Sequence, residues 1–183
     1  MSISTAPATP VLADLVCAIR EVVQLERSPA ESARLVAERL ECFLARPNLL
    51  PPEYREGDAG RYRQHLVHTE DDGSFSVVAL VWMPGQQTPI HDHVAWCVAG
   101  VYEGAEAEQR YELRGAGSTA RLVVAADVVN AAGTACGFAP PGDIHLVRNA
   151  GAGKVISIHI YGANIGKLGT SVRREYRLPI VAD

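Results

Sequence analysis

The sequence lacks several features that would assign it to well-defined protein classes. No apolar run approaches the roughly 20 residues needed to span a bilayer, and the opening segment MSISTAPATP has no basic stretch followed by an apolar one, as a secretory signal would. The four cysteines are scattered without CxxC spacing, which argues against a zinc knuckle or a disulfide scaffold. A net charge of −4 and the lack of a basic patch argue against nucleic-acid binding. We therefore expect a cytoplasmic protein with reduced thiols that binds neither membranes nor nucleic acid.

The composition is that of an ordinary folded domain. With 183 residues, 48% of them hydrophobic and 21% charged, the chain is long enough to enclose one real core. The texture changes along the chain, from helical signals near the start to short β-rich runs from Tyr62 onward. We expect residues 1–60 to be a helical segment of the same domain, and residues 61–183 to be a β-barrel with a C-terminal extension.

Residues 11–46 predict two helices. In the first, apolar side chains recur three and four positions apart, which makes one apolar face. These side chains are Leu12, Leu15, Ile19, Val22 and Val23. The second helix has a start signal, because Ser28 can serve as N-cap, Pro29 suits the first helical position, and Glu31 follows three residues after the cap. Pro47 should end it.

The rest of the chain predicts many short strands separated by glycine-rich turns. The expected strands are Ser76–Met83, Trp96–Tyr102, Ala107–Leu113, Leu122–Val129 and Val155–Tyr161. Short strands at this spacing are typical of an antiparallel sandwich or barrel. We therefore predict a mainly β protein, with the helices packed on the barrel.

Two histidines in this region carry the strongest chemical signal. His91 and His93 lie two apart, so on a strand both imidazoles point to the same face while Asp92 points to the other. Two convergent imidazoles are half of a metal site, and His145, which follows a turn, is the candidate third ligand. The alternative is that the histidines are ordinary surface or core residues with satisfied hydrogen bonds.

The residues around these histidines resemble the two motifs of the cupin superfamily. The first motif here reads Gly85, His91, His93, Cys97 and Gly104, and the second reads Pro140, Gly142, His145 and Asn149. The resemblance implies a small jelly-roll β-barrel with a divalent metal inside it. One position departs from the usual pattern, because cupins generally have a glutamate ligand where this chain has Cys97.

A cupin with three histidines and no glutamate resembles the thiol dioxygenases, the family of cysteine dioxygenase and 3-mercaptopropionate dioxygenase. A second constellation supports this match: Ser157, His159 and Tyr161 alternate with isoleucines and so share one face of a strand. The resemblance implies that Tyr161 donates a hydrogen bond to oxygen or substrate, and that His159 and Ser157 hold its hydroxyl. The alternative is a purely structural strand, with the isoleucines inside the barrel.

The resemblance also implies a reaction. One iron(II) ion per chain, held by His91, His93 and His145, would support the oxidation of a small thiol to its sulfinate with O2. In the family, the residue two positions after an early tyrosine separates two groups: an arginine there marks cysteine dioxygenases, and a glutamine marks 3-mercaptopropionate dioxygenases. Here Gln64 follows Tyr62, which favours the glutamine type and a thiol carboxylate as substrate, with cysteine dioxygenase as the alternative.

Glutamine cannot form the bidentate charged pair that arginine forms with a carboxylate. Another cation would then be needed to bind the substrate carboxylate. Arg173, with its neighbour Arg174, is the candidate, and the alternative is that both are surface charges.

Cys97 has three interpretations. It can be a small buried residue, a thiolate ligand in place of the cupin glutamate, or, by resemblance to mammalian cysteine dioxygenase, the partner of Tyr161 in a thioether crosslink. Two other functions also remain open for the chain as a whole. These are a metal-dependent cupin enzyme acting on other chemistry, and a non-catalytic metal-binding cupin that senses a small molecule.

Overall fold

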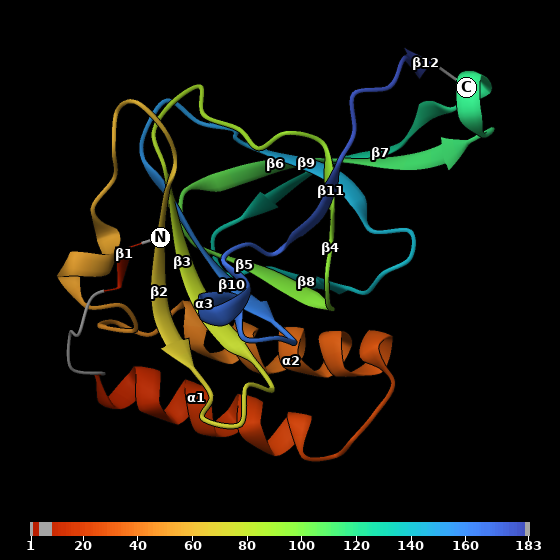
Figure 1. The fold of residues 1–183 in the computed structure, drawn as a ribbon. Helices are drawn as coiled ribbons and strands as arrows, with labels where there is room; N and C mark the ends of the chain where they lie inside the picture. Colours follow the sequence, from red (N-terminus) through yellow and green to blue (C-terminus); the bar gives the residue numbers. More distant parts are fainter. Residues whose placement is uncertain (1, 4–8, 182–183) are drawn as a thin grey trace.

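The structure is a computed structural model that describes residues 2–3 and 9–181, and it is a two-sheet barrel flanked by two long helices (Figure 1). The helices are α1 (Pro10–Val23), α2 (Pro29–Leu44) and the short α3 (Ile165–Leu168), with 3-10 turns at Pro52–Arg55 and Gly117–Thr119. The strands are β1 (Ser2–Ile3), β2 (Arg63–Thr69), β3 (Ser76–Trp82), β4 (His91–His93), β5 (Cys97–Glu103), β6 (Ala105–Arg114), β7 (Arg121–Ala131), β8 (Ala135–Phe138), β9 (Ile144–Asn149), β10 (Val155–Tyr161), β11 (Val172–Glu175) and β12 (Ile180–Val181).

The strands form two six-stranded sheets. One has the order β1-β2-β3-β10-β5-β8, and the other has the order β11-β4-β9-β6-β7-β12. Pairing is antiparallel except at the two edges where β1 meets β2 and β12 meets β7. The mainly β architecture predicted from the short strands is confirmed.

The two long helices cover the outer face of the first sheet (Figure 1). Both predicted helices are confirmed, and each begins at a side-chain cap: Thr9 Oγ1 accepts from the Leu12 amide at 3.1 Å and Ser28 Oγ from the Glu31 amide at 3.3 Å. Their apolar faces share one buried cluster with residues of β3, β5 and β10. In the described part of the chain, no helix is long and apolar enough to cross a membrane.

Strand β10 lies in the middle of the first sheet, between β3 and β5, and all seven of its residues are buried. Ile156, Ile158 and Ile160 belong to the apolar cluster that includes the helices. Because side chains alternate along a strand, Ser157 and His159 must point to the opposite side, into the barrel. Because the helices cover the outer face of the sheet, both faces of β10 are buried. The alternative in which the isoleucines point into the barrel is therefore wrong.

Candidate metal centre

The second sheet brings the three predicted histidines together inside the barrel. Strand β4 carries His91 and His93, β9 carries His145, and His91 is the direct cross-strand partner of His145. All three side chains are buried, and one ring nitrogen from each lies within 4.8 Å of the others. They are the one group of metal-binding side chains of this kind among the described residues.

The outer nitrogen of each ring already has an acceptor. His91 Nδ1 lies 3.0 Å from the Pro89 carbonyl oxygen, His93 Nδ1 lies 3.0 Å from Asp143 Oδ2, and His145 Nδ1 lies 2.8 Å from Glu108 Oε1. Since carbonyl and carboxylate oxygens only accept, each Nδ1 must carry the proton and each Nε2 keeps its lone pair. This is the arrangement in which histidines bind a metal, so the residues present fit one divalent ion.

The electrostatics of the site agree with ligation by neutral imidazoles. Burial, reinforced by the neighbouring imidazoles, lowers the pKa of His91 to about 3, and burial also lowers that of His93. Burial opposes the ionisation of Glu108, but its hydrogen bonds with His145 and Arg110 outweigh this and lower its pKa to about 2. Burial thus favours the neutral forms of His91 and His93, and carboxylates accept from His93 and His145.

The polar face of β10 forms a hydrogen-bonded chain beside the histidines. Trp82 Nε1 donates to Ser157 Oγ at 3.1 Å, Ser157 Oγ lies 3.1 Å from His159 Nε2, and His159 Nδ1 lies 3.3 Å from the Tyr161 hydroxyl. The ring centroids of Tyr161 and His93 are 6.0 Å apart. The structure therefore joins the three residues predicted as a relay and places Tyr161, at the end of that chain, next to the predicted metal ligands.

One small cavity of about 30 Å³ connects these groups. Its lining comprises Tyr62, Gln64, Leu80, Thr88, Pro89, His91, His93, His145, Val147, His159, Tyr161, Ser171 and Val172. The Tyr62 ring stacks on Trp82 with 4.7 Å between centroids, and its hydroxyl interacts with Gln64. Volume on this scale holds only one to a few water molecules, so the cavity favours a small ligand.

Comparison with known proteins agrees with the geometry of the site. The sequence model described as cysteine dioxygenase type I matches residues 1–168. The chain belongs to this family. It is therefore a cupin of the thiol dioxygenase type, with the mainly β barrel that the motifs implied.

The chain is also similar, at low sequence identity, to solved structures. A Klebsiella pneumoniae protein with a double-stranded β-helix domain is 19% identical over 65% of this chain and 93% of its own, with a TM-score of 0.49. A Desulfovibrio desulfuricans RmlC-like cupin is 23% identical over 64% and 95%, with a TM-score of 0.44.

In this member of the cysteine dioxygenase type I family, the predicted cation does not reach the cavity. Arg173 binds Asp92 Oδ2 at 2.5 Å, and Arg174 binds the same oxygen at 3.2 Å. Asp92 points away from His91 and His93, as the alternation on β4 predicts, so the two arginines lie on the outer side of the strand. The predicted contact of Arg173 with a substrate carboxylate is therefore not supported.

Cys97 is fully buried and is the cross-strand partner of Tyr161. Burial raises the pKa of its thiol well above the usual value, which disfavours the thiolate form that a metal ligand would need. It is not part of the histidine group in the described structure. The thioether with Tyr161 stays a prediction that the cross-strand pairing supports.

Three residues that contribute to the site were not predicted from the sequence: Glu108, Asp143 and Ser171. Asp143 stands two residues before His145, and Glu108 lies on a strand distant in sequence from every ligand. A signal existed for Asp143, because a carboxylate in the turn of the second motif suits a histidine partner. For Glu108 and Ser171 no local signal existed.

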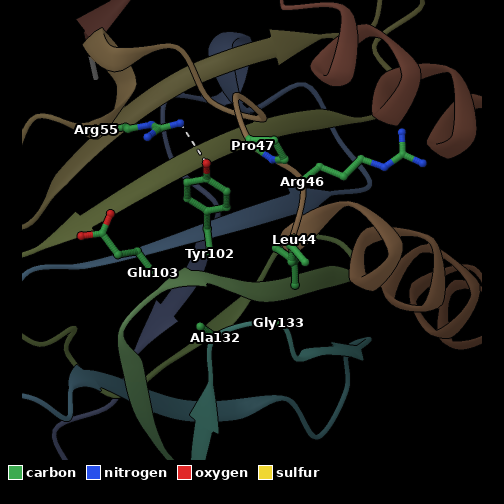
Figure 2. A pocket seen from close by; sticks show the side chains of 9 residues that line it. Leu44, Arg46, Pro47, Arg55, Tyr102, Glu103, Ala132 and Gly133 are labelled. Carbon is green, nitrogen blue, oxygen red and sulfur yellow. Dashed lines mark hydrogen bonds between the residues drawn. The ribbon is translucent and has the colours of Figure 1, made fainter.

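A larger depression of about 420 Å³ lies elsewhere, between the end of α2 and the β5–β6 hairpin (Figure 2). Its polar groups are already paired: Arg55 donates to the Tyr102 hydroxyl at 2.8 Å and to the Leu50 carbonyl at 3.0 Å. Arg46 instead packs over the Phe43 ring. None of the residues predicted for the site lines this depression, so the histidine cavity is the candidate active site.

Proposed function

We propose that this protein is an iron(II)-dependent thiol dioxygenase that oxidises a small thiol carboxylate to its sulfinate, and that it is of the glutamine type. One observation supports this most directly: the three convergent imidazoles and the Tyr161 hydroxyl line the same cavity. Iron(II) held by three neutral imidazoles would supply the O2 chemistry and two positive charges, which a thiolate and a carboxylate together would neutralise.

The protein's own groups then have separate tasks. Burial keeps the pKa of Tyr161 well above its usual value, so its hydroxyl retains its proton and can donate a hydrogen bond into the cavity. His159, whose pKa burial lowers to about 3, is neutral and fixes the position of that hydroxyl. Gln64 and Tyr62 also line the cavity and are the neutral donors available to the substrate carboxylate.

In the part of the chain that the structure describes, no lysine or arginine lines the cavity, which favours the glutamine type over cysteine dioxygenase. Arg63, next to Gln64, lies on the other face of β2 and its nearest acidic partner is Glu56 at 3.5 Å. Among the described residues, no guanidinium reaches the cavity to fix the carboxylate of cysteine while its amine and sulfur both bind iron, so a thiol carboxylate without the amine should be the better substrate.

The test is O2 consumption by iron-loaded protein with 3-mercaptopropionate, L-cysteine and cysteamine, with the product identified as a sulfinate by mass spectrometry. We expect kcat/KM for 3-mercaptopropionate to exceed that for L-cysteine by at least about tenfold, or about 1.4 kcal/mol of transition-state binding. His91→Ala is the control and should lose both metal and activity. A preference for L-cysteine would reject the glutamine type, and no sulfinate from any thiol would reject the dioxygenase.

A further inference from the structure

A chain of polar contacts leads from His145 to the surface of the barrel. His145 Nδ1 donates to Glu108 Oε1 at 2.8 Å, and the other oxygen of that carboxylate, Oε2, accepts from Arg110 Nη2 at 2.7 Å. The side chain of Glu108 is 3% exposed, whereas that of Arg110 is 43% exposed. The buried partner of a predicted metal ligand is therefore itself bound by a cation that solvent reaches.

This cation lines a second cavity, of about 120 Å³, on the outer side of His145. His145 is the one described residue that lines both this cavity and the cavity that holds the three histidines. Glu108 and Asp143, the carboxylates that accept from His145 and His93, also line the second cavity. Arg110 is the one cationic side chain among its described lining residues, so it is the group placed to offset their negative charge.

The carboxylate of Glu108 needs a second contact to keep one orientation. The last torsion of a glutamate side chain is broad, so a single hydrogen bond to His145 leaves the group free to turn. Arg110 provides a charge-assisted bond at the other oxygen, while the Cys136 thiol, 3.9 Å from Oε2, is only a weak donor. Glu106, on the same face of β6, is also buried, but its Oε1 has no hydrogen-bond partner among the described residues.

We propose that Arg110 is a positioning residue of the metal centre, which acts through Glu108 to hold the imidazole of His145 in its ligating orientation. The proposal rests on the metal ligands of the proposed function and is independent of the thiol that is oxidised. Arg110 does not line the cavity of the three histidines, so its effect must pass through Glu108. Its loss should therefore weaken metal binding without removing a ligand.

The same strand offers a matched control. Arg114 pairs with Glu112, two residues before it, as Arg110 pairs with Glu108, and the Arg114 side chain is 42% exposed. The Glu112 side chain, however, is 60% exposed, and neither residue of this pair lines the two cavities. Arg114→Met thus removes the same charge at the same exposure and leaves the contact of Glu108 with His145 intact.

The first test is the affinity of the purified protein for Zn2+, measured by competition with a chromophoric chelator. Arg110→Met should lower this affinity about tenfold, at the low end of the effect of removing an outer partner of a metal ligand. Arg110→Lys keeps a cationic donor, although not the planar guanidinium, and should recover part of the loss. Arg114→Met should leave the affinity unchanged.

The second test asks whether the effect passes through Glu108. In the Glu108→Ala background Arg110 has no carboxylate to hold, so adding Arg110→Met should change the Zn2+ affinity by less than about twofold. Exchange of the His145 Nδ1 proton with water, followed by NMR of the Zn2+-loaded protein, gives an independent readout. It should become faster in Arg110→Met and not in Arg114→Met, because the acceptor of that proton is no longer held in place.

Equal Zn2+ affinity of Arg110→Met and the unaltered protein would overturn the proposal, and so would a loss of the same size in the Glu108→Ala background. If Arg110→Met does not fold, Arg110→Gln removes the charge with a polar side chain and should also lower the affinity; an unchanged affinity there would overturn the proposal. The expected results in a protein that oxidises no thiol would instead reject the dioxygenase function and leave Arg110 in its role.

Discussion

At the scale of single residues, the hydroxyl of Tyr161 is the protein group that should act on the reacting atoms. Tyr161→Phe removes it and keeps the ring, so we expect the fold and metal content to survive and kcat to fall roughly 10- to 1,000-fold. O2 consumption and metal analysis of the purified variant check this. Tyr111→Phe is the control, because Tyr111 is equally buried but lies outside the cavity. Unchanged turnover in Tyr161→Phe would show that the polar face of β10 is not catalytic.

A second residue-scale prediction concerns Glu108, which holds the outer nitrogen of His145 at 2.8 Å. Glu108→Ala should weaken divalent metal binding roughly 10- to 100-fold, because His145 loses the acceptor that fixes its tautomer and orientation. Competition with a chromophoric chelator measures the affinity. Glu112→Ala on the same strand removes an exposed carboxylate and should leave the affinity unchanged. Equal affinities in the two variants would contradict this role.

At the scale of elements, β11 pairs with β4 and holds it in place. β11 follows residue 168, where the match to the family model ends. The contact centres on Asp92, which is buried and accepts from Arg173, Arg174 and Tyr176. Because Asp92 lies between the two ligands of β4, the element that binds it also fixes their strand.

Asp92→Asn should therefore destabilise the fold by roughly 1–3 kcal/mol, since a buried hydrogen-bond network loses the negative charge of its acceptor. It should also weaken metal binding. Thermal unfolding and a metal titration measure both effects. Arg177→Ala breaks only an exposed pair with Glu175 and serves as the control. Retained stability and affinity in Asp92→Asn would mean that β11 is not needed to hold the site.

At the scale of the whole molecule, Glu106 should make stability depend on pH. Its pKa is about 7 in the folded protein and near 4.5 when unfolded, so between these values the folded state binds more protons. Its contribution to the free energy of unfolding is then present below about pH 4.5 and is lost as pH rises to about 7, a change of roughly 3 kcal/mol. Urea unfolding at pH 5 and pH 8 should show Glu106→Gln gaining stability relative to the unaltered protein at the higher pH. If the free energy of unfolding of the two proteins differed by the same amount at pH 5 and at pH 8, the raised pKa of Glu106 would be contradicted.

Local patterns in the sequence were enough to predict the two long helices, the limits of β10 and several of the residues that line the cavity. The period-2 alternation put His91 and His93 on one face, and it did the same for Ser157, His159 and Tyr161. These patterns depend only on neighbours along the chain, which is why they could be interpreted without a structure. His145 was the candidate third ligand because it follows a turn, and the family resemblance supported it and added Gln64.

Only the tertiary structure decided which buried charges are paired. Arg173 was a reasonable partner for a substrate by charge alone, but the pairing of β11 with β4 directs it to Asp92. Glu106 and Glu108 are equivalent in the sequence, two acidic residues on one strand, yet β9 brings His145 to Glu108, whereas Oε1 of Glu106 has no hydrogen-bond partner among the described residues. Alternation determines which face of a strand a side chain occupies, whereas its partner depends on how strands distant in sequence are aligned across the barrel.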